Sequence, residues 1–382
     1  NPPFAANHSY MKFDHPTEVL ITQIEQLEAR RSLRNCTLQA LDLKSLEIEW
    51  SDFEIDNTAF LGCSLKLEDE LTLRRLGAQI YPTPARPLPY DPFRTSLYTW
   101  EELLAKAPDS REQMDLRIYE HFSDTKFNPN INEALWQRIH DHSIDEGLRQ
   151  LLQFDEHGMT ELKCVGIMGG HSTKRSDPFY ERTARTAMLL GQAGYFVVSG
   201  GGPGIMEAAN LGAYLAEDGE DALQEALHIL RPAPHYTQPG YHEAALEVLK
   251  RYPDGALNLA IPTWFYGHEP SNVFASHIAK YFSNSIREDT LLAISLYGII
   301  CAPGSAGTTQ EIFMDATQNH YGTFNYYSPM VFLGRQRYEI ETMIFPLLKQ
   351  LAWGRAYHDL LFLTDEPQEV VSFLKAHPPI RV

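Results

Sequence analysis

The chain has 382 residues, 43% of them hydrophobic, so it is long enough for two or three domains and a sizeable core. Its formal net charge of −18 argues against a nucleic-acid or anionic-membrane surface, because phosphate contacts require clustered Lys and Arg. That charge does not exclude a small anionic ligand, since distant carboxylates are screened over about 8 Å at physiological ionic strength.

Residues 1–81 carry an apolar repeat of period five and are expected to form a β-rich accessory region. The repeat falls on Leu38, Leu43, Ile48 and Phe53, and a second set precedes it by two positions at Cys36, Leu41, Leu46 and Ser51. This pattern is typical of a short pentapeptide-type β-solenoid, in which each pair of residues points into a narrow core. Two ordinary amphipathic strands would also produce it.

Residues 82–155 are expected to form a Pro-rich linker followed by helices. Five prolines between 82 and 92 remove backbone donors and favour an extended path. Helical patterns follow around 110–122 and 131–153. His140 and His142 lie two apart on the second of these, so we expect them to face different ways and to be solvated. Because residues 1–150 lack glycine loops and convergent polar motifs, we expect them to support assembly or stability rather than chemistry.

Residues 156–382 alternate strand-like and helix-like segments. The apolar runs at 163–168, 195–199, 256–261, 297–302, 330–333 and 360–363 are near-continuous, as in strands buried on both faces. Pro178 and Pro203 suit the first turns of two of the helices between them. This order predicts an α/β domain with a doubly wound parallel sheet, in which ligands bind beyond the carboxyl ends of strands.

The segment 214–255 delays the third strand and is rich in charge, Pro and Tyr. A lid and a surface elaboration are both open interpretations. A helix is expected over 272–284, and it would contain His277 as a packed residue. Just before it, Trp264, Phe265 or Tyr266 is a candidate to stack on a ligand ring, although buried aromatics are commonly core.

Two glycine-rich turns are the strongest functional signals. One runs through 199–210 (SGGGPGIMEAAN) and the other through 303–311 (PGSAGTTQE). Each ends an apolar run and begins a helical pattern, which aims free backbone N–H groups and the helix dipole at one point. That arrangement suits a phosphate. Each turn is followed by a carboxylate, Glu207 or Glu311, that is a candidate acid or base.

Glu311 and Arg287 each have a simpler explanation. A carboxylate near a helix start commonly stabilises the helix, which is the more usual role for Glu311 judged by position alone. Arg287, flanked by Glu288 and Asp289, would by itself indicate a surface ion pair.

These motifs resemble the LOG family, the "lysine decarboxylase-like" nucleotide 5′-monophosphate phosphoribohydrolases. Its signatures read roughly G-G-G-x-x-G-x-M and P-G-G-x-G-T-x-x-E. The bacterial pyrimidine/purine nucleotide 5′-monophosphate nucleosidases are the nearest branch, through a G-G-H-S turn at 169–172 and a G-P-G-x-M-E-A run at 202–208. The resemblance covers about residues 160–365.

The resemblance implies a Rossmann-like fold, at least a homodimer, and hydrolysis of a nucleoside 5′-monophosphate to free base and ribose 5-phosphate, with no metal or other cofactor. Glu311 matches the family's catalytic glutamate, and Arg287 lies within one position of its essential arginine. The implied substrate- and phosphate-binding residues are Gly169, Gly170, His171, Ser172, Gly201, Gly202, Gly204, Glu207, Gly304, Ser305, Gly307, Thr308 and Thr309.

Ser305 departs from the family motif, which has glycine there. If the position required a positive φ, serine would cost on the order of 1 kcal/mol or more and would reshape the pocket. A non-catalytic binding protein for a nucleotide, alarmone or phosphorylated cofactor is therefore the alternative function.

The four cysteines are far apart and form no C-x-x-C pair, so a reducing cytoplasm is expected. Cys164 and Cys301 lie inside apolar runs and are expected to be core residues.

Overall fold

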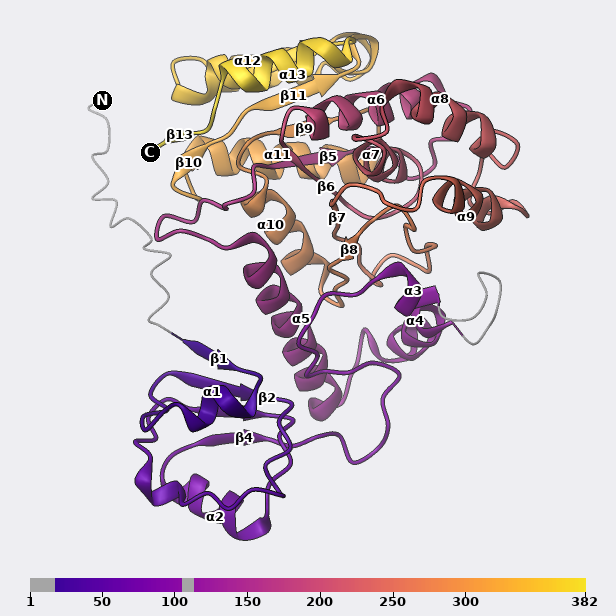
Figure 1. The fold of residues 1–382 in the computed structure, drawn as a ribbon. Coiled ribbons are helices and arrows are strands. Elements are labelled where there is room, and N and C mark those ends of the chain that lie inside the picture. Colours follow the sequence, from indigo (N-terminus) through magenta and orange to yellow (C-terminus); the bar gives the residue numbers. More distant parts are fainter. Residues whose placement is uncertain (1–17, 105–112) are drawn as a thin grey trace.

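The computed structural model describes residues 18–104 and 113–382, and Figure 1 shows their path. Positions 110–112 of the helix expected over 110–122 lie outside the described residues. A small β domain lies at one end of the molecule, and a larger α/β domain lies at the other (Figure 1). Helix α5 (Ile131–Leu152) runs between them. The expected division into 1–81, 82–155 and 156–382 is kept as a proposal.

The small domain is a stack of parallel coils. Its strands are β1 (Val19–Ile21), β2 (Cys36–Gln39), β3 (Ala59–Leu61) and β4 (Gln79–Tyr81). All neighbouring pairs are parallel: Val19 pairs with Cys36, Thr37 with Ala59, and Ala59 with Gln79. Each coil thus returns to the same face after about 20 residues, as in a solenoid and unlike two ordinary amphipathic strands.

The period-five pattern is followed only in part. Cys36, Leu38, Leu41 and Leu43 are buried, whereas Leu46, Ile48 and Phe53 are half-buried and Ser51 is exposed. The change begins at Leu46, before the 3-10 turn Trp50–Asp52, and the large Trp50 side chain of that turn is buried in the core. Two short helices, α1 (Ile24–Glu28) and α2 (Leu67–Arg75), complete the domain.

The small domain is joined to the rest through buried hydrogen bonds. Gln39 Nε2 donates to the carbonyl oxygens of Phe93 and Arg94 at 3.0 and 2.7 Å, and lies 3.1 Å from Ser143 Oγ on α5. The Pro-rich stretch after β4 forms no helix, and Tyr98 bridges to Ile278. Helices α3 (Trp100–Leu104), α4 (Met114–Thr125) and α5 follow.

The large domain is built on seven parallel strands, which confirms the predicted doubly wound α/β fold. Their spatial order is β12-β11-β9-β5-β6-β7-β8. They span β5 (Cys164–Met168), β6 (Phe196–Ser199), β7 (Leu259–Ala260), β8 (His277–Ile278), β9 (Ile299–Cys301), β11 (Met330–Leu333) and β12 (Leu361–Thr364). Because β5 is flanked by β6 and β9, the order reverses beside β5.

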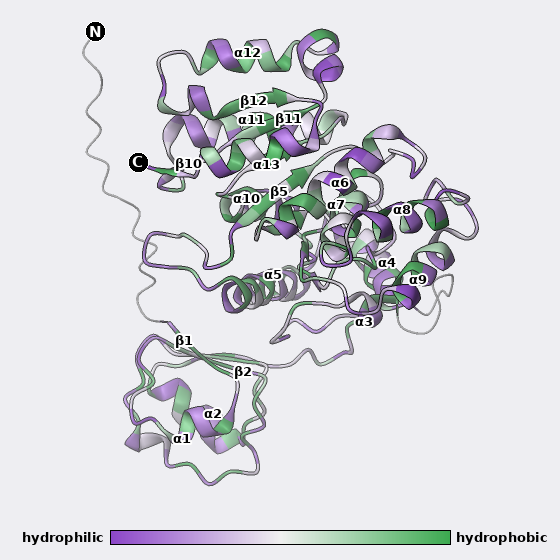
Figure 2. Cartoon of the chain, turned by 45° about the horizontal axis from the view of Figure 1, so that its top comes forward, coloured by the Kyte–Doolittle hydropathy of each residue, from purple (hydrophilic) through white to green (hydrophobic). Residues whose placement is uncertain are grey.

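Helices cover both faces of this sheet, so its strands are apolar throughout (Figure 2). One face packs on α6 (Pro178–Gln192), α7 (Ile205–Tyr214) and α13 (Pro367–Ala376). The other packs on α5, α10 (Asn284–Ile294), α11 (Ala306–Tyr321) and α12 (Ile344–Leu351). Side chains alternate along β5, since Val165 and Ile167 face the first layer and Cys164 and Met168 the second.

The remaining elements are peripheral. The delayed segment after α7 forms α8 (Gly219–Leu230) and α9 (Tyr241–Arg251), whose apolar sides pack with α6 and α7. Near the C-terminus, β10 (Tyr326–Tyr327) pairs with β13 (Ile380–Arg381), and two turns precede and follow α12, Gln336–Glu341 and Ala356–Leu360.

Two expectations about histidines were wrong. The helix expected over 272–284 is absent; His277 lies in the short strand β8, and the helix begins only at Asn284. The shortness of β8 explains the error, because a strand of two residues leaves little periodic signal in the sequence. His140 is fully buried rather than solvated, with Nε2 2.8 Å from the Tyr98 hydroxyl.

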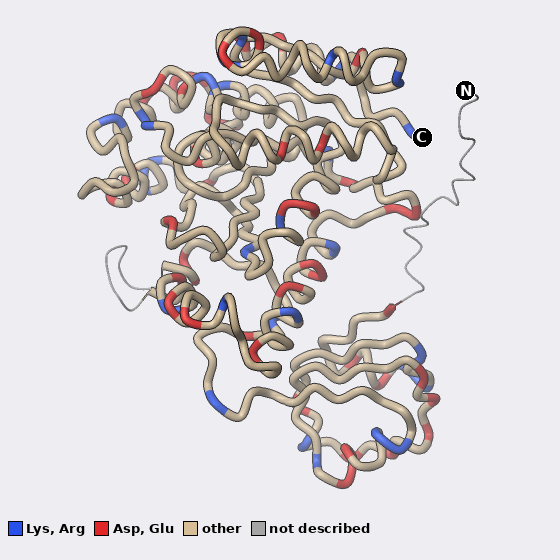
Figure 3. Tube along the Cα trace, turned by 180° about the vertical axis from the view of Figure 1, so that it is seen from behind, with Lys and Arg blue, Asp and Glu red and all other residues tan. Residues whose placement is uncertain are grey.

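Figure 3 shows Lys and Arg scattered among acidic residues along the described trace. All four cysteines are buried and free, as expected for Cys164 and Cys301. Among the described residues, no helix is both long and apolar enough to cross a membrane.

Candidate active site

A pocket opens where the strand order reverses. The loops after β5, β6 and β9 meet there, since Gly170 N donates to Pro303 O at 3.0 Å and Ile205 N donates to Gly170 O at 3.1 Å. The cavity has a volume of about 680 Å³, within the range of small-ligand sites. This is the place that the topology of a doubly wound sheet favours for a ligand.

Two glycines allow the loops to approach each other. A Cβ on Gly204, where φ is +69°, would lie 2.5 Å from Gly170 O. A Cβ on Gly304 would overlap the Thr308 side chain and lie 3.0 Å from Gly170 N. These two motif glycines therefore allow the loops to pack closely, and neither glycine lines the cavity.

The loop after β9 presents the start of a long helix to the cavity. Helix α11 begins at Ala306, and Ser305, Ala306, Gly307 and Thr308 all line the pocket. The first N–H groups of a helix have no intrahelical acceptor, so this end can bind an anion. Arg337 Nη2 donates to Gly304 O at 2.7 Å and fixes the loop from behind.

Ser305 is not strained. Its φ is −109°, well outside the left-handed region, so the position does not require glycine. The condition for the penalty, a positive φ, is therefore not met. The argument that Ser305 reshapes the pocket, which favoured a non-catalytic protein, loses its basis.

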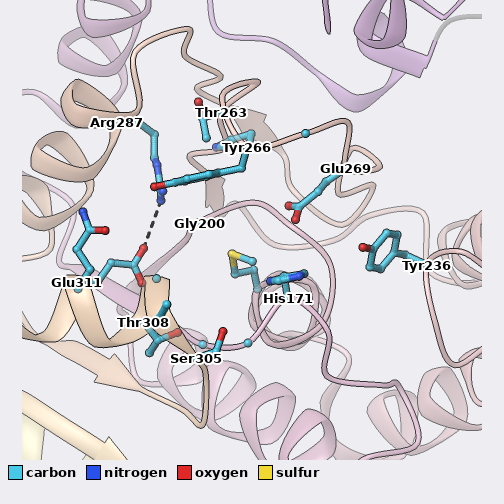
Figure 4. Close-up of a pocket in the computed structure, with 18 of the residues that line it drawn as sticks. His171, Gly200, Tyr236, Thr263, Tyr266, Glu269, Arg287, Ser305, Thr308 and Glu311 are labelled. Atoms are coloured by element: carbon cyan, nitrogen blue, oxygen red, sulfur yellow. Dashed lines mark hydrogen bonds and ion pairs between the residues drawn. The ribbon is translucent and has the colours of Figure 1, made fainter. Parts of the chain in front are cut away.

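Arg287 and Glu311 meet at the side of the pocket (Figure 4). Arg287 Nη1 donates to Glu311 Oε1 at 3.4 Å, and their side chains are only 8% and 12% exposed. Arg287 Nη2 also donates to Asn284 Oδ1 at 3.0 Å, while Nε is buried without a partner in the described residues. Arg287 is therefore not the surface ion pair that its neighbours in sequence suggested.

The environment of Glu311 shifts its acidity. Burial raises the pKa of the Glu311 carboxyl, Arg287 opposes that rise, and Glu288 adds to it. A carboxylate with a raised pKa is a better proton acceptor near neutral pH. The side chain pairs with Arg287 and not with a backbone N–H, which disfavours the helix-capping interpretation.

Another part of the pocket wall comes from the segment after β7. Tyr266 lies in this segment and is 64% exposed, and its hydroxyl accepts a hydrogen bond from Asn284 Nδ2 at 2.9 Å. Trp264 is fully buried and Phe265 does not line the pocket, so Tyr266 is the aromatic candidate available for stacking. Glu269 and His171 also line the cavity, across from the Arg287–Glu311 pair (Figure 4).

Glu207 is a predicted site residue that the structure places elsewhere. Its carboxylate is buried behind the loop, where Arg175 Nε and Nη2 donate to it at 2.9 and 2.5 Å and the Tyr180 hydroxyl at 2.7 Å. With these three bonds it fixes α7 against α6, and it does not line the pocket. This position does not support the predicted role of Glu207 in substrate binding.

The fifteen predicted site residues divide into two groups. Eight line the pocket: Gly169, Gly170, His171, Arg287, Ser305, Gly307, Thr308 and Glu311. Seven do not: Ser172, Gly201, Gly202, Gly204, Glu207, Gly304 and Thr309. Thr309, for example, turns its hydroxyl back to Ser305 O at 2.9 Å.

Further lining residues were not among the predicted site residues: Gly200, Met206, Tyr236, Pro262, Thr263, Gly267, His268, Glu269, Ala306 and Gln310. Several follow the end of β7, and that position was the available signal for them. Tyr236 comes from the segment after α8, so part of the delayed segment borders the pocket. No group of three or more His, Cys, Asp or Glu is placed to hold a metal in the described part of the chain.

No family model and no curated protein matches this chain. Among solved structures, a molybdenum cofactor binding protein from the phototrophic bacterium Rippkaea orientalis is 14% identical, with a TM-score of 0.38, over 56% of this chain and 97% of that one. The Moco carrier protein from Chlamydomonas reinhardtii is 13% identical, with a TM-score of 0.35, over 56% of this chain and 97% of that one. Similarity at this level carries no argument about a ligand, and the fold class rests on the sheet itself.

Proposed function

We propose that this pocket hydrolyses the N-glycosidic bond of a nucleoside 5′-monophosphate to free base and ribose 5-phosphate. The observation that carries the proposal is the buried Arg287–Glu311 pair, which lies beside the exposed start of α11 in one cavity. The pair joins a cation to a carboxylate of raised pKa, and the helix start supplies donors for an anion.

The phosphate is assigned to the loop after β9. Residues 305–308 line the cavity, the first N–H groups of α11 have no intrahelical acceptor, and Arg287 Nε lacks a partner among the described residues. Charge-assisted hydrogen bonds contribute roughly 1.5–3 kcal/mol each. A nucleoside without its phosphate should therefore be a much poorer substrate.

The bond cleavage is assigned to Glu311. As the C1′–N bond breaks, its electron pair leaves with the base and positive charge develops on the ribose ring. Glu311 stabilises that charge or orients a water molecule, whose oxygen bonds to C1′. The water loses one proton, and the departing base nitrogen gains one. Arg287 holds Glu311 and the sugar phosphate in position.

The experiment is to incubate the purified protein with AMP, GMP, CMP and UMP and to measure released base and ribose 5-phosphate by chromatography. The matched nucleosides and the Glu311→Gln variant serve as controls. Release of base from one or more monophosphates, lost in the variant, supports the proposal. Binding of nucleotides by the unaltered protein without any released base would contradict it and favour the non-catalytic alternative.

Two further expectations belong to this proposal. The family resemblance predicts at least a homodimer, and the four separate cysteines indicate a reducing cytoplasm; both stay predictions. Sedimentation of the purified chain tests the first of them.

A further inference from the structure

A buried carboxylate outside the large domain's sheet holds one wall of the pocket. Asp115, on α4, is fully buried, and four hydrogen bonds converge on it. Trp264 Nε1 donates to Oδ1 at 2.7 Å and Ser271 Oγ donates to Oδ2 at 2.9 Å. Lys280 Nζ lies 2.8 and 3.0 Å from the two oxygens.

Trp264 and Ser271 are the two ends of one segment. Between them lie Tyr266, His268 and Glu269, which all line the pocket. One carboxylate thus fixes both ends of a segment that follows it by about 150 residues in the chain. The segment contains no helix or strand of its own, so its path depends on these side-chain bonds together with the backbone bond from Trp264 N to Tyr281 O at 3.1 Å.

Other residues of the same region contact the middle of this segment. Lys126, directly after α4, donates from Nζ to Phe265 O at 3.1 Å. The Tyr119 ring lies 5.7 Å from the His268 ring, and His268 Nε2 is 3.7 Å from Asp115 Oδ2. The segment is thus supported along its length by the α4 region.

The charges at this site are balanced. Burial alone would raise the pKa of Asp115, but Lys280, His268 and the Trp264 hydrogen bond hold that pKa below its usual value. A buried pair of this kind contributes geometric definition more dependably than net stability. Both carboxylate oxygens of Asp115 accept hydrogen bonds from other side chains, which fixes the orientation of the carboxylate.

We propose that Asp115 is a positioning residue for the base-binding wall of the pocket, acting through the segment 264–271. The inference rests on the proposed nucleotide site, in which Tyr266 and its neighbours face the base and the start of α11 faces the phosphate. Asp115 then determines how tightly the base is held and has little influence on the phosphate.

The test compares Asp115→Asn with Glu133→Gln. Glu133 is a matched control because it is also a buried carboxylate in the helical region, and its partners Tyr90, His121 and Gln137 lie outside the segment 264–271. Affinities for AMP, GMP, CMP and UMP and for ribose 5-phosphate are measured by calorimetry. Hydrogen exchange of backbone amides in residues 262–272 is measured without ligand.

Asp115→Asn should weaken binding of the preferred nucleotide at least tenfold and change that of ribose 5-phosphate less than twofold. Exchange within 262–272 should become faster in this variant and stay unchanged in Glu133→Gln. Equal losses for both ligands, or unchanged exchange, would overturn the proposal. If the unaltered protein binds no nucleotide, the proposed function fails, but the exchange measurement still decides the role of Asp115.

A milder variant guards against misfolding. Ser271→Ala removes one of the donors to Asp115 and leaves the Lys280 ion pair intact. Ser271→Ala should weaken binding of the preferred nucleotide about threefold and leave the affinity for ribose 5-phosphate nearly unchanged. A Ser271→Ala protein with normal exchange in 262–272 and unchanged nucleotide affinity would count against the proposal even if Asp115→Asn does not fold.

Discussion

Arg287 Nη1 lies 3.4 Å from Glu311 Oε1, although the two residues are 24 positions apart and belong to different helices. Helix α10 carries the arginine before strand β9, and α11 carries the glutamate after it. Both helices pack on the same face of the sheet, which brings the two side chains together at its carboxyl edge. The chemistry proposed for the pocket depends on this contact.

Replacing Glu311 with Gln should abolish most turnover. The variant keeps the size of the side chain and loses the charge that stabilises the developing cation. We expect kcat to fall about 10²-fold or more, equivalent to roughly 2.7 kcal/mol of transition-state stabilisation, with little change in nucleotide affinity. Steady-state kinetics and a melting curve are measured on the same variant. Glu339→Gln, which alters an exposed ion pair with Arg335, is the control. Normal turnover with a lowered melting point would instead indicate a role in helix stability.

Arg287→Lys should impair binding although the charge is kept. A lysine ammonium cannot reproduce the planar fork that reaches Glu311 and Asn284 together. We expect nucleotide affinity to fall about tenfold, or ~1.4 kcal/mol. Calorimetry measures this loss, and Arg185→Lys, in an exposed pair with Glu220, is the reference. Wild-type affinity in Arg287→Lys would show that only the charge matters.

Ser305→Gly should destabilise the protein, even though it restores the family motif. The φ of −109° is readily adopted by serine, so glycine gains no relief of strain and makes the unfolded chain more flexible. The expected loss is about 0.4–1 kcal/mol in the free energy of unfolding, measured by denaturant titration. A more stable Ser305→Gly variant would indicate hidden strain at this position.

Asp315 should make the stability of the protein depend on pH. It is 3% exposed, one turn beyond Glu311 on α11, and burial raises its pKa from 3.8 to about 8. The Asp315 carboxyl therefore binds its proton more tightly in the folded state than in the unfolded state. Protonation of Asp315 therefore contributes to the free energy of unfolding. This contribution is fully present below about pH 3.8 and is lost as the pH rises to about 8.

Asp315→Asn removes this titration while keeping the shape of the side chain. Its melting temperature relative to the unaltered protein should therefore increase steadily between pH 4 and pH 8. Melting curves at several pH values test this. A difference that stays constant over that range would mean that Asp315 ionises normally in the folded protein.

Much of the fold could be predicted because local signals were strong. Six apolar runs became β5, β6, β7, β9, β11 and β12, and Asp177 caps α6 as its sequence suggests, accepting a hydrogen bond from Phe179 N at 2.8 Å. Strand β8 was missed because two residues carry no period. His140 was misjudged because its burial depends on Tyr98, Trp264 and Phe282, which pack around it from distant parts of the chain.

The sequence by itself determined the parallel sheet, the two glycine turns and the position of Glu311 in the first turns of a helix, because each of these features depends on residues that are neighbours in the chain. Only the tertiary structure decided which of those residues face the ligand. Glu207 and Glu311 follow similar turns, yet Arg175 and Tyr180 bind the first inside the core, and Arg287 holds the second beside the cavity. The link from Asp115 to Trp264 and Ser271 likewise has no local signature, since a buried carboxylate acquires its partners only when separate segments pack together.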